Sequence, residues 1–365
     1  MSSAGDTYLQ TMTGPVISVS RKSRSRSRAK KLLKLLHDKK NILVTTHQHP
    51  DPDALASSLG MYVLLTKKLP HAKISMSIKG PVKGGINEMF VRQSNLKLTP
   101  WDDATLKEYE AIVLLDAQPL FAYSPLPVDV TPIAVLDHHR SRGRHPNCPF
   151  CDIRTDVGAT SSIVFSYFLE LEVPIDRSLA ALLLYAIESD LAGAAGTPGE
   201  LDKVALSSLM LLADTHKFYQ MRYADLPLSY FTACYDGLGH AVYYDNAILS
   251  HLGDIDSIEK PALIADFLLR FEPIKWSLVT AVYDGKLVLS IRTADPKLSA
   301  ADLIRKLLHK IGEGGGHRTK AGGMIKLTTG TAHEIEKLLH LLKVRYLRQL
   351  NVSAAKPQHL IPHCK

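Results

Sequence analysis

Three short apolar runs in the first half of the chain each end in acidic or histidine residues. They occupy residues 43–46, 111–115 and 133–136, and their length and apolar character predict buried strands of a parallel sheet. Because the carboxyl ends of parallel strands lie along one edge of a sheet, where ligands usually bind, we expect the residues behind these runs to converge. Those residues are His47, Asp51, Asp53, Asp116, Asp137, His138 and His139.

The loop after the first run has the residue types of a metal site. His47, Asp51 and Asp53 follow one another closely, and carboxylates with an imidazole suit hard divalent ions such as Mn²⁺ or Mg²⁺. Pro50 and Pro52 alternate with the two aspartates and restrict the backbone around them, so the carboxylates are positioned before a ligand binds. A helical pattern begins directly behind this loop, and an aspartate that caps the helix beside a solvated neighbour is an equally good interpretation.

Helical patterns cover most of the stretch behind the third run. Residues 159–173 begin with Ser and Thr, whose N–H and hydroxyl groups could face an anion or act as simple caps. Residues 178–196 form an apolar pattern that reaches Glu188 and Asp190 before a Gly/Ala-rich break. An acid at the end of such an apolar run usually has a cationic partner or a metal, so Asp190 joins the candidate ligands, while we interpret Glu188 as a surface acid.

The second half of the chain predicts a smaller α+β domain. Alternating residues fill 276–293, and Asp284 with Gly285 in their middle is a strong signal for a hairpin. Amphipathic helices are predicted at residues 300–311 and 331–350. Strands mixed with helices in this order are typical of a domain of roughly 110 residues.

A glycine-rich loop is expected between these two helices, at residues 313–323. Its consecutive N–H groups could form an anion-binding nest, although a flexible turn after a helix would have the same sequence. Ser290 and Arg292, on the strand that leaves the hairpin, could hold a phosphate. The candidate residues of the loop itself are Gly314, Gly315, Gly316, His317, Arg318 and Lys320.

Composition is that of an ordinary globular protein, with 45% apolar and 22% charged residues among 365. No stretch of about 18 uncharged apolar residues is present, and the N-terminus lacks the apolar core of a secretory signal. We therefore expect a cytoplasmic protein that does not contact the membrane. Of four cysteines, Cys148 and Cys151 form a CPFC motif, which we interpret as a turn with reduced thiols because a zinc site needs a second pair.

Positive charge is concentrated near the N-terminus. Residues 21–40 contain ten Lys and Arg against one Asp, whereas the rest of the chain carries 34 basic and 35 acidic residues. Residues 1–28 end in a Ser/Arg-rich stretch that is expected to stay unpacked. This tail could contact RNA or DNA nonspecifically through phosphates or be a transit-like extension, and an amphipathic helix is predicted over residues 29–40.

Taken together, these motifs resemble the DHH phosphoesterase superfamily, which is named for the triplet present here as Asp137, His138 and His139. The resemblance covers about residues 30–350, and its motifs occur in the order known for the family. The remaining matches are the His-x-x-x-Asp-x-Asp motif of His47, Asp51 and Asp53, the strand-end Asp116, the helix-end Asp190, and the glycine-rich signature of Gly314 to His317 with Ala321 and Gly322.

The resemblance implies an α/β fold with a parallel-sheet DHH domain, flanking helices and a smaller C-terminal α+β substrate-binding domain. RecJ-type exonucleases are similar but longer, so the length points to the compact two-domain members of the NrnA type. The implied division is a disordered tail at 1–28, a catalytic domain at 29–215, a helical linker at 216–245, a substrate-binding domain at 246–350 and a second tail at 351–365.

By the family pattern, the chain is a phosphodiesterase with two divalent cations. Mn²⁺ is the expected ion, with Mg²⁺ or Co²⁺ as alternatives. His47, Asp51 and Asp190 are expected to hold one ion, Asp53 and His138 the other, and Asp116 is expected to bridge them. The triplet Asp137, His138 and His139 is the implied catalytic set, and the implied substrate-binding set is Ser290, Arg292, Gly314, Gly315, Gly316 and His317.

The implied substrates are short oligoribonucleotides or linear dinucleotides, hydrolysed to nucleoside monophosphates, with pAp as a further substrate. A cyclic-dinucleotide phosphodiesterase and a nucleotide-binding regulator without catalysis are the alternatives that the sequence leaves open. A homodimer is compatible with each of them.

Overall fold

The structure of the chain is a computed structural model. It describes residues 27–80, 82, 85–119, 121, 123–140, 148–191, 198–354 and 356–362. Most of the Ser/Arg-rich tail therefore lies outside the described residues. The chain divides into two compact units. The first comprises Met1–Pro81, Gln93–Asp190 and Pro198–Gln220, and the second Val82–Arg92, Leu191–Thr197 and Met221–Lys365.

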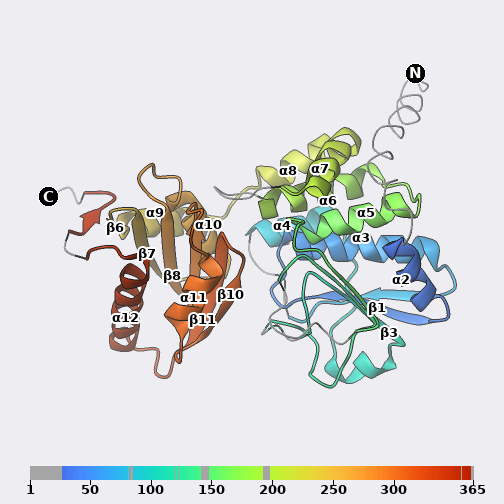
Figure 1. The fold of residues 1–365 in the computed structure, drawn as a ribbon, viewed down its shortest axis with the longest axis horizontal. Helices are drawn as coiled ribbons and strands as arrows, with labels where there is room; N and C mark the ends of the chain where they lie inside the picture. Colours follow the sequence, from blue (N-terminus) through green and yellow to red (C-terminus); the bar gives the residue numbers. More distant parts are fainter. Residues whose placement is uncertain are drawn as a thin grey trace. The chain divides into compact units, whose positions relative to one another are not determined.

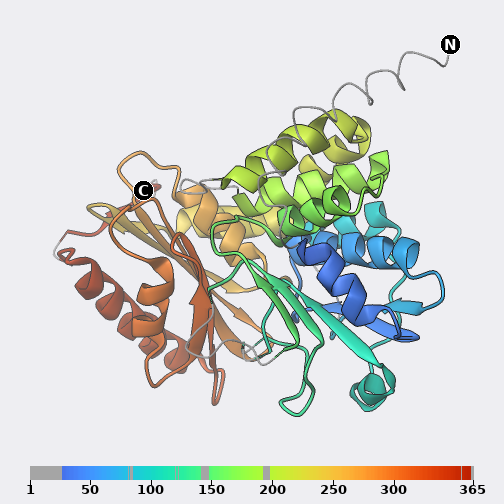
Figure 2. The same cartoon turned by 45° about the vertical axis from the view of Figure 1, so that its right-hand side comes forward.

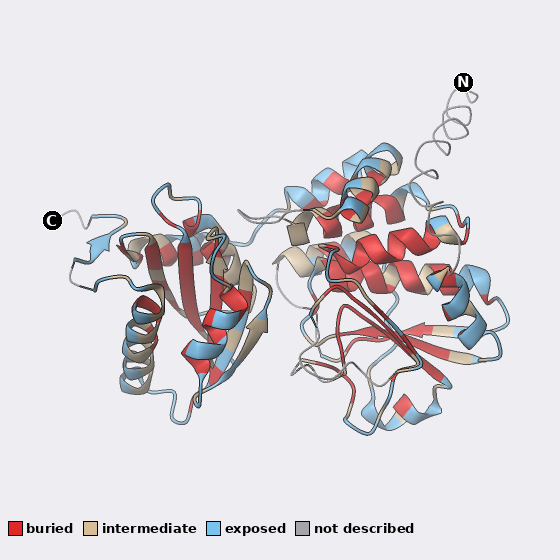
Figure 3. Cartoon of the chain, viewed as in Figure 1, coloured by how far each residue is buried: buried red, intermediate tan, exposed pale blue. Residues whose placement is uncertain are grey.

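The first unit is built on a sheet of five parallel strands (Figure 1). The three apolar runs form neighbouring strands in its centre, as the sequence predicts, with Val44 paired to Val113 and Leu115 paired to Leu136. Their side chains are buried because helices cover the sheet (Figure 3). In spatial order the strands are β2 (Lys73–Met76), β1 (Asn41–Thr46), β3 (Ala111–Leu115), β4 (Ala134–Asp137) and β5 (Phe150–Ile153).

Helices of the first unit pack closely against one another as well as on the sheet. Gly60 lies where α3 meets α5, and a Cβ there would come within 2.9 Å of Val164 Cγ1. The absence of a side chain at Gly60 therefore lets the two helices approach. The helical segments are α2 (Arg28–Leu36), α3 (Pro52–Lys68), the 3₁₀ helix η2 (Asp103–Glu108), α5 (Thr160–Glu170), α6 (Arg177–Leu191), α7 (Glu200–Leu212) and α8 (Thr215–Arg222).

The second unit contains a seven-stranded sheet in which only β7 and β8 pair in parallel. Helices α11 and α12 cover one face of this sheet and α10 the other (Figure 2). Their apolar side chains form two clusters with those of the strands. In spatial order the strands are β10 (Glu313–Gly316), β11 (Lys320–Lys326), β9 (Lys286–Thr293), β8 (Trp276–Tyr283), β7 (Ala247–Asp254), β6 (Val242–Tyr244) and β12 (Gln358–His359). The helices are α9 (Leu228–Gly239), α10 (Lys260–Leu268), α11 (Ala300–Leu308) and α12 (Ala332–Leu350). The α/β class with a second, mostly antiparallel domain is confirmed.

A short segment from the first half of the sequence belongs to the second unit. Helix α4 (Gly85–Ser94) begins where the N–H of Gly85 donates to the hydroxyl of Tyr230 at 2.7 Å and the N–H of Ile86 donates to Glu259 at 3.3 Å. These bonds satisfy N–H groups in the first turn of the helix. They explain why residues 82–92 pack with the second unit although they lie between β2 and β3 in the sequence.

The hairpin predicted at Asp284 and Gly285 is confirmed. These two residues join β8 to β9 and have φ angles of 48° and 67°, the left-handed values that a two-residue hairpin turn requires.

The prediction of a loop at residues 313–323 is wrong for its first glycines. Gly314, Gly315 and Gly316 form strand β10, paired with Gly323, Gly322 and Ala321 of β11. Successive N–H groups of a strand point in opposite directions, so these glycines do not form the nest that we considered. Glycine is needed at Gly314 for another reason. A Cβ there would lie 2.7 Å from Leu308 Cδ1 in α11, which is too close for a side chain.

Two further expectations concern the cysteines and the membrane. Cys148 and Cys151 form a disulfide with a Cα–Cα distance of 6.2 Å, within the range for such bonds, so the expectation of reduced thiols in this motif is wrong. Among the helices that the structure describes, none has both the length and the apolar character needed to cross a bilayer.

Candidate metal centre

The ends of β1, β3 and β4 and the last turn of α6 bring acidic and histidine side chains of the first unit together. Oδ2 of Asp116 lies 3.5 Å from Nε2 of His47, and Oδ1 of Asp116 lies 3.4 Å from Nε2 of His138. The same nitrogen of His138 lies 3.4 Å from Oδ2 of Asp190. The convergence expected from the parallel strands is therefore present around Asp116.

Three sets of potential ligand atoms can be distinguished among the described residues of this cluster, and one of them is Asp116 with Asp137 and His139 of the triplet. Within each set, the atoms lie within 4.8 Å of one another. Donors bound to one cation at about 2.1 Å are separated by about 3 Å in octahedral geometry, so the observed spacings fit a cation with modest contraction. The other two sets, which contain the expected ligands, are His47, Asp51 and Asp116, and Asp53, His138 and Asp190. Asp190 is thus grouped with Asp53 and His138, whereas the family pattern implied a place beside His47 and Asp51.

Asp116 has an unusual backbone at the point where β3 ends. Its φ angle of 54° lies in the left-handed region, which aspartate tolerates better than most residues but which is still strained. Its carboxylate also accepts a hydrogen bond of 2.8 Å from the hydroxyl of Thr160. The strained turn and this bond direct the two carboxylate oxygens of Asp116 toward different histidines.

The N-terminus of α5 binds an acid of the protein itself. The N–H groups of Thr160 and Ser161 donate to the two oxygens of Asp53 at 2.7 and 2.8 Å. The sequence left open whether this helix start faces an anion or is simply capped. The structure shows that these N–H groups face the carboxylate of Asp53 and hold its two oxygens in fixed positions, with the positive end of the helix dipole beside it.

The first loop combines both interpretations that its sequence allowed. Asp51 caps α3, since its Oδ1 accepts from the N–H of Ala54 at 3.0 Å, and it also belongs to the donor set with His47 and Asp116. Nδ1 of His47 lies 2.8 Å from the carbonyl oxygen of Gln48. A proton on Nδ1 would satisfy that carbonyl and leave Nε2 as the ligand atom that faces Asp116.

This cluster contains buried carboxylates whose negative charges a cation would compensate. Burial, with the neighbouring Asp190 and Asp51, raises the pKa of Asp53 to about 8. Burial and the carboxylates of Asp53 and Asp51 raise the pKa of Asp116 well above its usual range. Several buried carboxylates at such distances repel one another unless protons or metal ions compensate them. The donor set, rich in oxygen and with two imidazoles, fits divalent cations.

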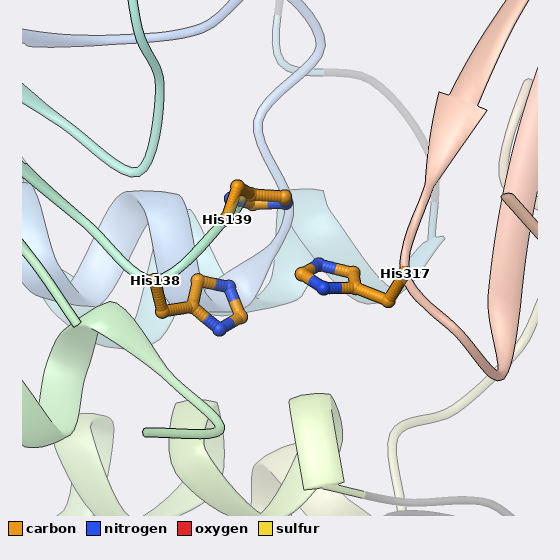
Figure 4. A group of neighbouring side chains, drawn as sticks. All are labelled: His138, His139 and His317. Carbon is orange, nitrogen blue, oxygen red and sulfur yellow. The ribbon is translucent and has the colours of Figure 1, made fainter. Parts of the chain in front are cut away.

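The triplet at the end of β4 is organised by its aspartate. Oδ1 of Asp137 accepts from the N–H of His138 at 2.9 Å and lies 2.7 Å from Nδ1 of His139. The two rings have centroids 4.4 Å apart and are inclined by 67° (Figure 4). Burial favours the neutral form of Asp137, but His139 and His138 outweigh it and lower the pKa of Asp137 to about 2.

The pKa values of the two histidines of the triplet are shifted in opposite directions. Burial and the adjacent His139 lower the pKa of His138, which leaves a neutral ring able to offer a lone pair to a metal. Burial also opposes the charge of His139, but Asp137 prevails and raises its pKa. The pair therefore combines a potential ligand with a potential proton donor.

Gln118 is a residue of this centre that the sequence analysis missed. Its side-chain amide donates to Oδ2 of Asp137 at 2.6 Å and to the carbonyl oxygen of His139 at 3.0 Å. The only signal in the sequence was its place two residues behind the strand-end Asp116.

The residues expected to bind substrate in the second unit lie on adjacent strands. Arg292 donates through Nη1 to the hydroxyl of Ser290 at 2.7 Å and through Nε to Asp266 at 2.8 Å. Across the ladder, Ser290 pairs with Gly322, which in turn pairs with Gly315. His317 follows β10, and its N–H donates to the carbonyl of Lys320 at 2.7 Å. Asp266 in α10, which holds the guanidinium of Arg292, was not anticipated.

A comparison with known families decides the classification of the first unit. Residues 41–187 match the family described as "DHH family, N-terminal domain". This part of the chain is similar to the N-terminal domain of the DHH family. The resemblance inferred from the sequence motifs is thereby confirmed, and the DHH region contains all the candidate ligands except Asp190.

Relatives with similar sequences extend beyond the DHH region. An uncharacterized protein of Methanocaldococcus jannaschii is 28% identical over 305 residues, which cover 83% of this chain and 62% of that protein. A probable manganese-dependent inorganic pyrophosphatase of Listeria innocua is 32% identical over 174 residues, or 47% of this chain and 55% of the relative. The chain thus spans less than two thirds of the length of these relatives.

Solved structures share the fold at lower identity. An exopolyphosphatase-related protein from Bacteroides fragilis has a TM-score of 0.70 at 18% identity and covers 89% of this chain and 97% of its own. RecJ from Thermus thermophilus in complex with Mn²⁺ has a TM-score of 0.53 at 16% identity, with 89% of this chain and 54% of RecJ covered. Likeness at this level of identity concerns the fold.

Proposed function

We propose that this DHH protein is a metal-dependent phosphoester hydrolase that cleaves short oligoribonucleotides or linear dinucleotides to nucleoside monophosphates, with pAp as a further substrate. The match of residues 41–187 to the DHH family supports the hydrolase class. The observation that carries the proposal is the position of Asp116, whose two oxygens face His47 and His138 in different donor sets. Asp116 belongs to the set with His47 and also lies 3.4 Å from His138 of the other set. A carboxylate that faces both sets in this way suits a pair of neighbouring cations.

The two donor sets would each hold one divalent cation, with Asp116 of the first set facing His138 of the second. When bound, such a pair activates a water molecule and neutralises charge on the phosphoryl oxygens. Mn²⁺ is the proposed ion because imidazole and carboxylate ligands occur together, and because relatives carry the names manganese-dependent pyrophosphatase and RecJ in complex with Mn²⁺. Mg²⁺ and Co²⁺ are the alternatives.

The protein's own groups would position the substrate and transfer protons. Since Asp137 holds Nδ1 of His139 at 2.7 Å, His139 would use Nε2 to donate a proton to a phosphoryl or leaving oxygen. Asp137 keeps that ring oriented and stabilises its charge. His138 would bind through Nε2, which faces Asp116 and Asp190.

The second unit would bind another part of the substrate. Ser290 and Arg292 lie side by side on β9, and Asp266 fixes the orientation of the guanidinium. A guanidinium held in this way suits a phosphate group. We assign nucleotide contacts to these residues together with His317 and the glycine-rich strand β10, as the family pattern implied.

A substrate panel with the purified protein tests the proposal. The panel contains pGpG, pAp and diribonucleotides to pentaribonucleotides, each with Mn²⁺, Mg²⁺, Co²⁺ or chelator. We expect release of mononucleotides with Mn²⁺ and none with chelator. The Asp116→Asn variant should lose this activity, whereas Asp129→Asn, which changes an exposed acid of the same unit, should retain it. Absence of turnover on every nucleotide would contradict the proposal.

Two other activities are decided by the same panel. Hydrolysis of inorganic pyrophosphate is the alternative that the name of the Listeria relative suggests, and c-di-AMP tests the cyclic-dinucleotide phosphodiesterase. Turnover of either compound well above that of the linear substrates would replace the proposed substrate class. Tight nucleotide binding without any turnover would favour a regulator.

A further inference from the structure

Two aromatic side chains stand beside the metal centre in the loop between β3 and β4. The ring of Tyr123 meets the ring of His47 edge to face, with centroids 5.4 Å apart, and the ring of Phe121 meets that of His139 in the same way at 6.0 Å. Phe121 and Tyr123 also contact each other, with centroids 5.4 Å apart and planes inclined by 57°. We call this pair the aromatic platform.

The aromatic platform is held by the backbone on both sides. The N–H of Phe121 donates to the carbonyl of Gln118 at 3.0 Å, and the N–H of Ser124 donates to the carbonyl of Phe121 at 2.9 Å. Gln48, beside the metal loop, donates its N–H to the carbonyl of Tyr123 at 2.9 Å and its side-chain amide to the carbonyl of Ser124 at 3.2 Å. The rings are therefore positioned before any ligand binds.

The position of these rings is not explained by the core. Both side chains are partly exposed, whereas Ser124 and Leu126 behind them are buried. Aromatic rings are among the largest apolar groups and gain most when they are fully buried. A partly exposed pair that touches His47 and His139, next to the place proposed for a phosphate, has the surface on which a flat ring can stack.

We propose that Phe121 and Tyr123 form a subsite for the nucleobase of the nucleotide whose phosphate lies at Asp116 and His139. This inference rests on the proposed function and narrows its substrates to phosphoesters that carry a base, as opposed to inorganic phosphates. Stacking on aromatic side chains accepts every base, because each base has a flat face. The subsite therefore selects for the presence of a base and little for its identity.

Kinetics on matched substrates test the aromatic platform. The substrates are the diribonucleotide pApA and its analogue without bases, and the variants are Phe121→Leu and Tyr123→Leu, which keep an apolar side chain but remove the ring. We expect KM for pApA to rise by about tenfold, in keeping with the usual strength of base stacking, while KM for the analogue and kcat for both stay unchanged. Phe121→Tyr keeps a ring at this position and should therefore have the wild-type KM for pApA. Tyr235→Leu, at an exposed position of α9, should change neither KM nor kcat.

Equal losses on both substrates, or no loss on either, would overturn the inference, because the rings would then only support the histidines. A binding measurement separates this outcome from a failure of the proposed function. AMP and ribose 5-phosphate are titrated in the presence of Mn²⁺ into the wild type and both leucine variants. Tighter binding of AMP by the wild type alone supports the subsite even without turnover, and equal binding of the two compounds by the wild type refutes it.

Discussion

The side-chain amide of Gln118 donates to Asp137 at 2.6 Å and to the carbonyl of His139 at 3.0 Å. Gln118 thus links the end of β3 to the triplet at the end of β4, and it acts on the ring of His139 through Asp137 and the backbone. Because Asp137 orients the ring of His139, the position of that ring depends on a neutral amide two residues behind Asp116.

Replacement of Gln118 is expected to slow the reaction. In Gln118→Ala the carboxylate of Asp137 loses a buried donor, which should lower kcat by roughly 10–100-fold, as changes to groups behind metal-site residues do, and lower the free energy of unfolding by about 1–3 kcal/mol. Steady-state kinetics on the best substrate and urea unfolding measure the two effects. Gln118→Glu places a second negative charge beside Asp137 and should be no better; wild-type kcat in this variant would refute the role.

Asp116→Asn is expected to increase the stability of the metal-free protein and to decrease its activity. The buried carboxylate lies among other acids, so its neutralisation removes repulsion in the absence of metal. We expect a higher unfolding temperature in chelator and a loss of activity of about 100-fold or more, since the carboxylate that faces both donor sets is gone. Calorimetric titration with Mn²⁺ should show weaker binding and less than two ions per chain. Two tightly bound ions in the variant would show that Asp116 is not shared.

The stability of the second unit is expected to fall as the pH rises, through Glu259. Burial raises the pKa of Glu259 to about 7, so the folded state keeps a proton that the unfolded state has lost above its usual pKa of 4.5. The stabilising contribution is thus complete below pH 4.5 and is lost as the pH rises through 7. Glu259→Gln should remove this loss, on the order of 2 kcal/mol between pH 5 and pH 8.

Urea unfolding of wild type and Glu259→Gln at pH 5 and pH 8 measures this difference. Glu334 provides a control with the opposite shift, because backbone N–H groups of Thr328 and Thr329 lower its pKa to about 2. Glu334→Gln should therefore destabilise the protein equally at both pH values. If the free energy of unfolding of Glu259→Gln differed from that of the wild type by the same amount at both pH values, burial of a protonated carboxyl at Glu259 would not explain the effect.

Asp266→Ala is expected to affect substrate binding more than stability. Asp266 orients the guanidinium of Arg292 at 2.8 Å, and its own side chain is 39% exposed, so the ion pair contributes less than about 1 kcal/mol to folding. Without it, KM for short oligoribonucleotides should rise about tenfold at unchanged kcat, as for the loss of one oriented charged contact. Asp302→Ala, at an exposed ion pair of α11, is the control. An unchanged KM would remove Arg292 from the proposed substrate contacts.

Local patterns in the sequence already determined much of this protein. The apolar runs became β1, β3 and β4, and their order and direction placed His47, Asp116 and His138 at one edge of a sheet. The hairpin at Asp284 likewise follows from two adjacent residues that accept left-handed backbone. Such features depend on neighbours in the chain, whose steric and hydrophobic preferences act over a few residues.

Only the tertiary structure decided which partner each polar group has. Asp53 accepts a hydrogen bond from the start of α5, 107 residues further along the chain. Gln118 and Asp266 form hydrogen bonds with residues on other elements. Residues 82–92 belong to the second unit. The glycines expected in a loop pair with β11 as a strand, and α11 packs so closely against Gly314 that a side chain would not fit there. Contacts of this kind depend on how whole elements pack, and packing is set by the burial of many side chains at once, which no local pattern encodes.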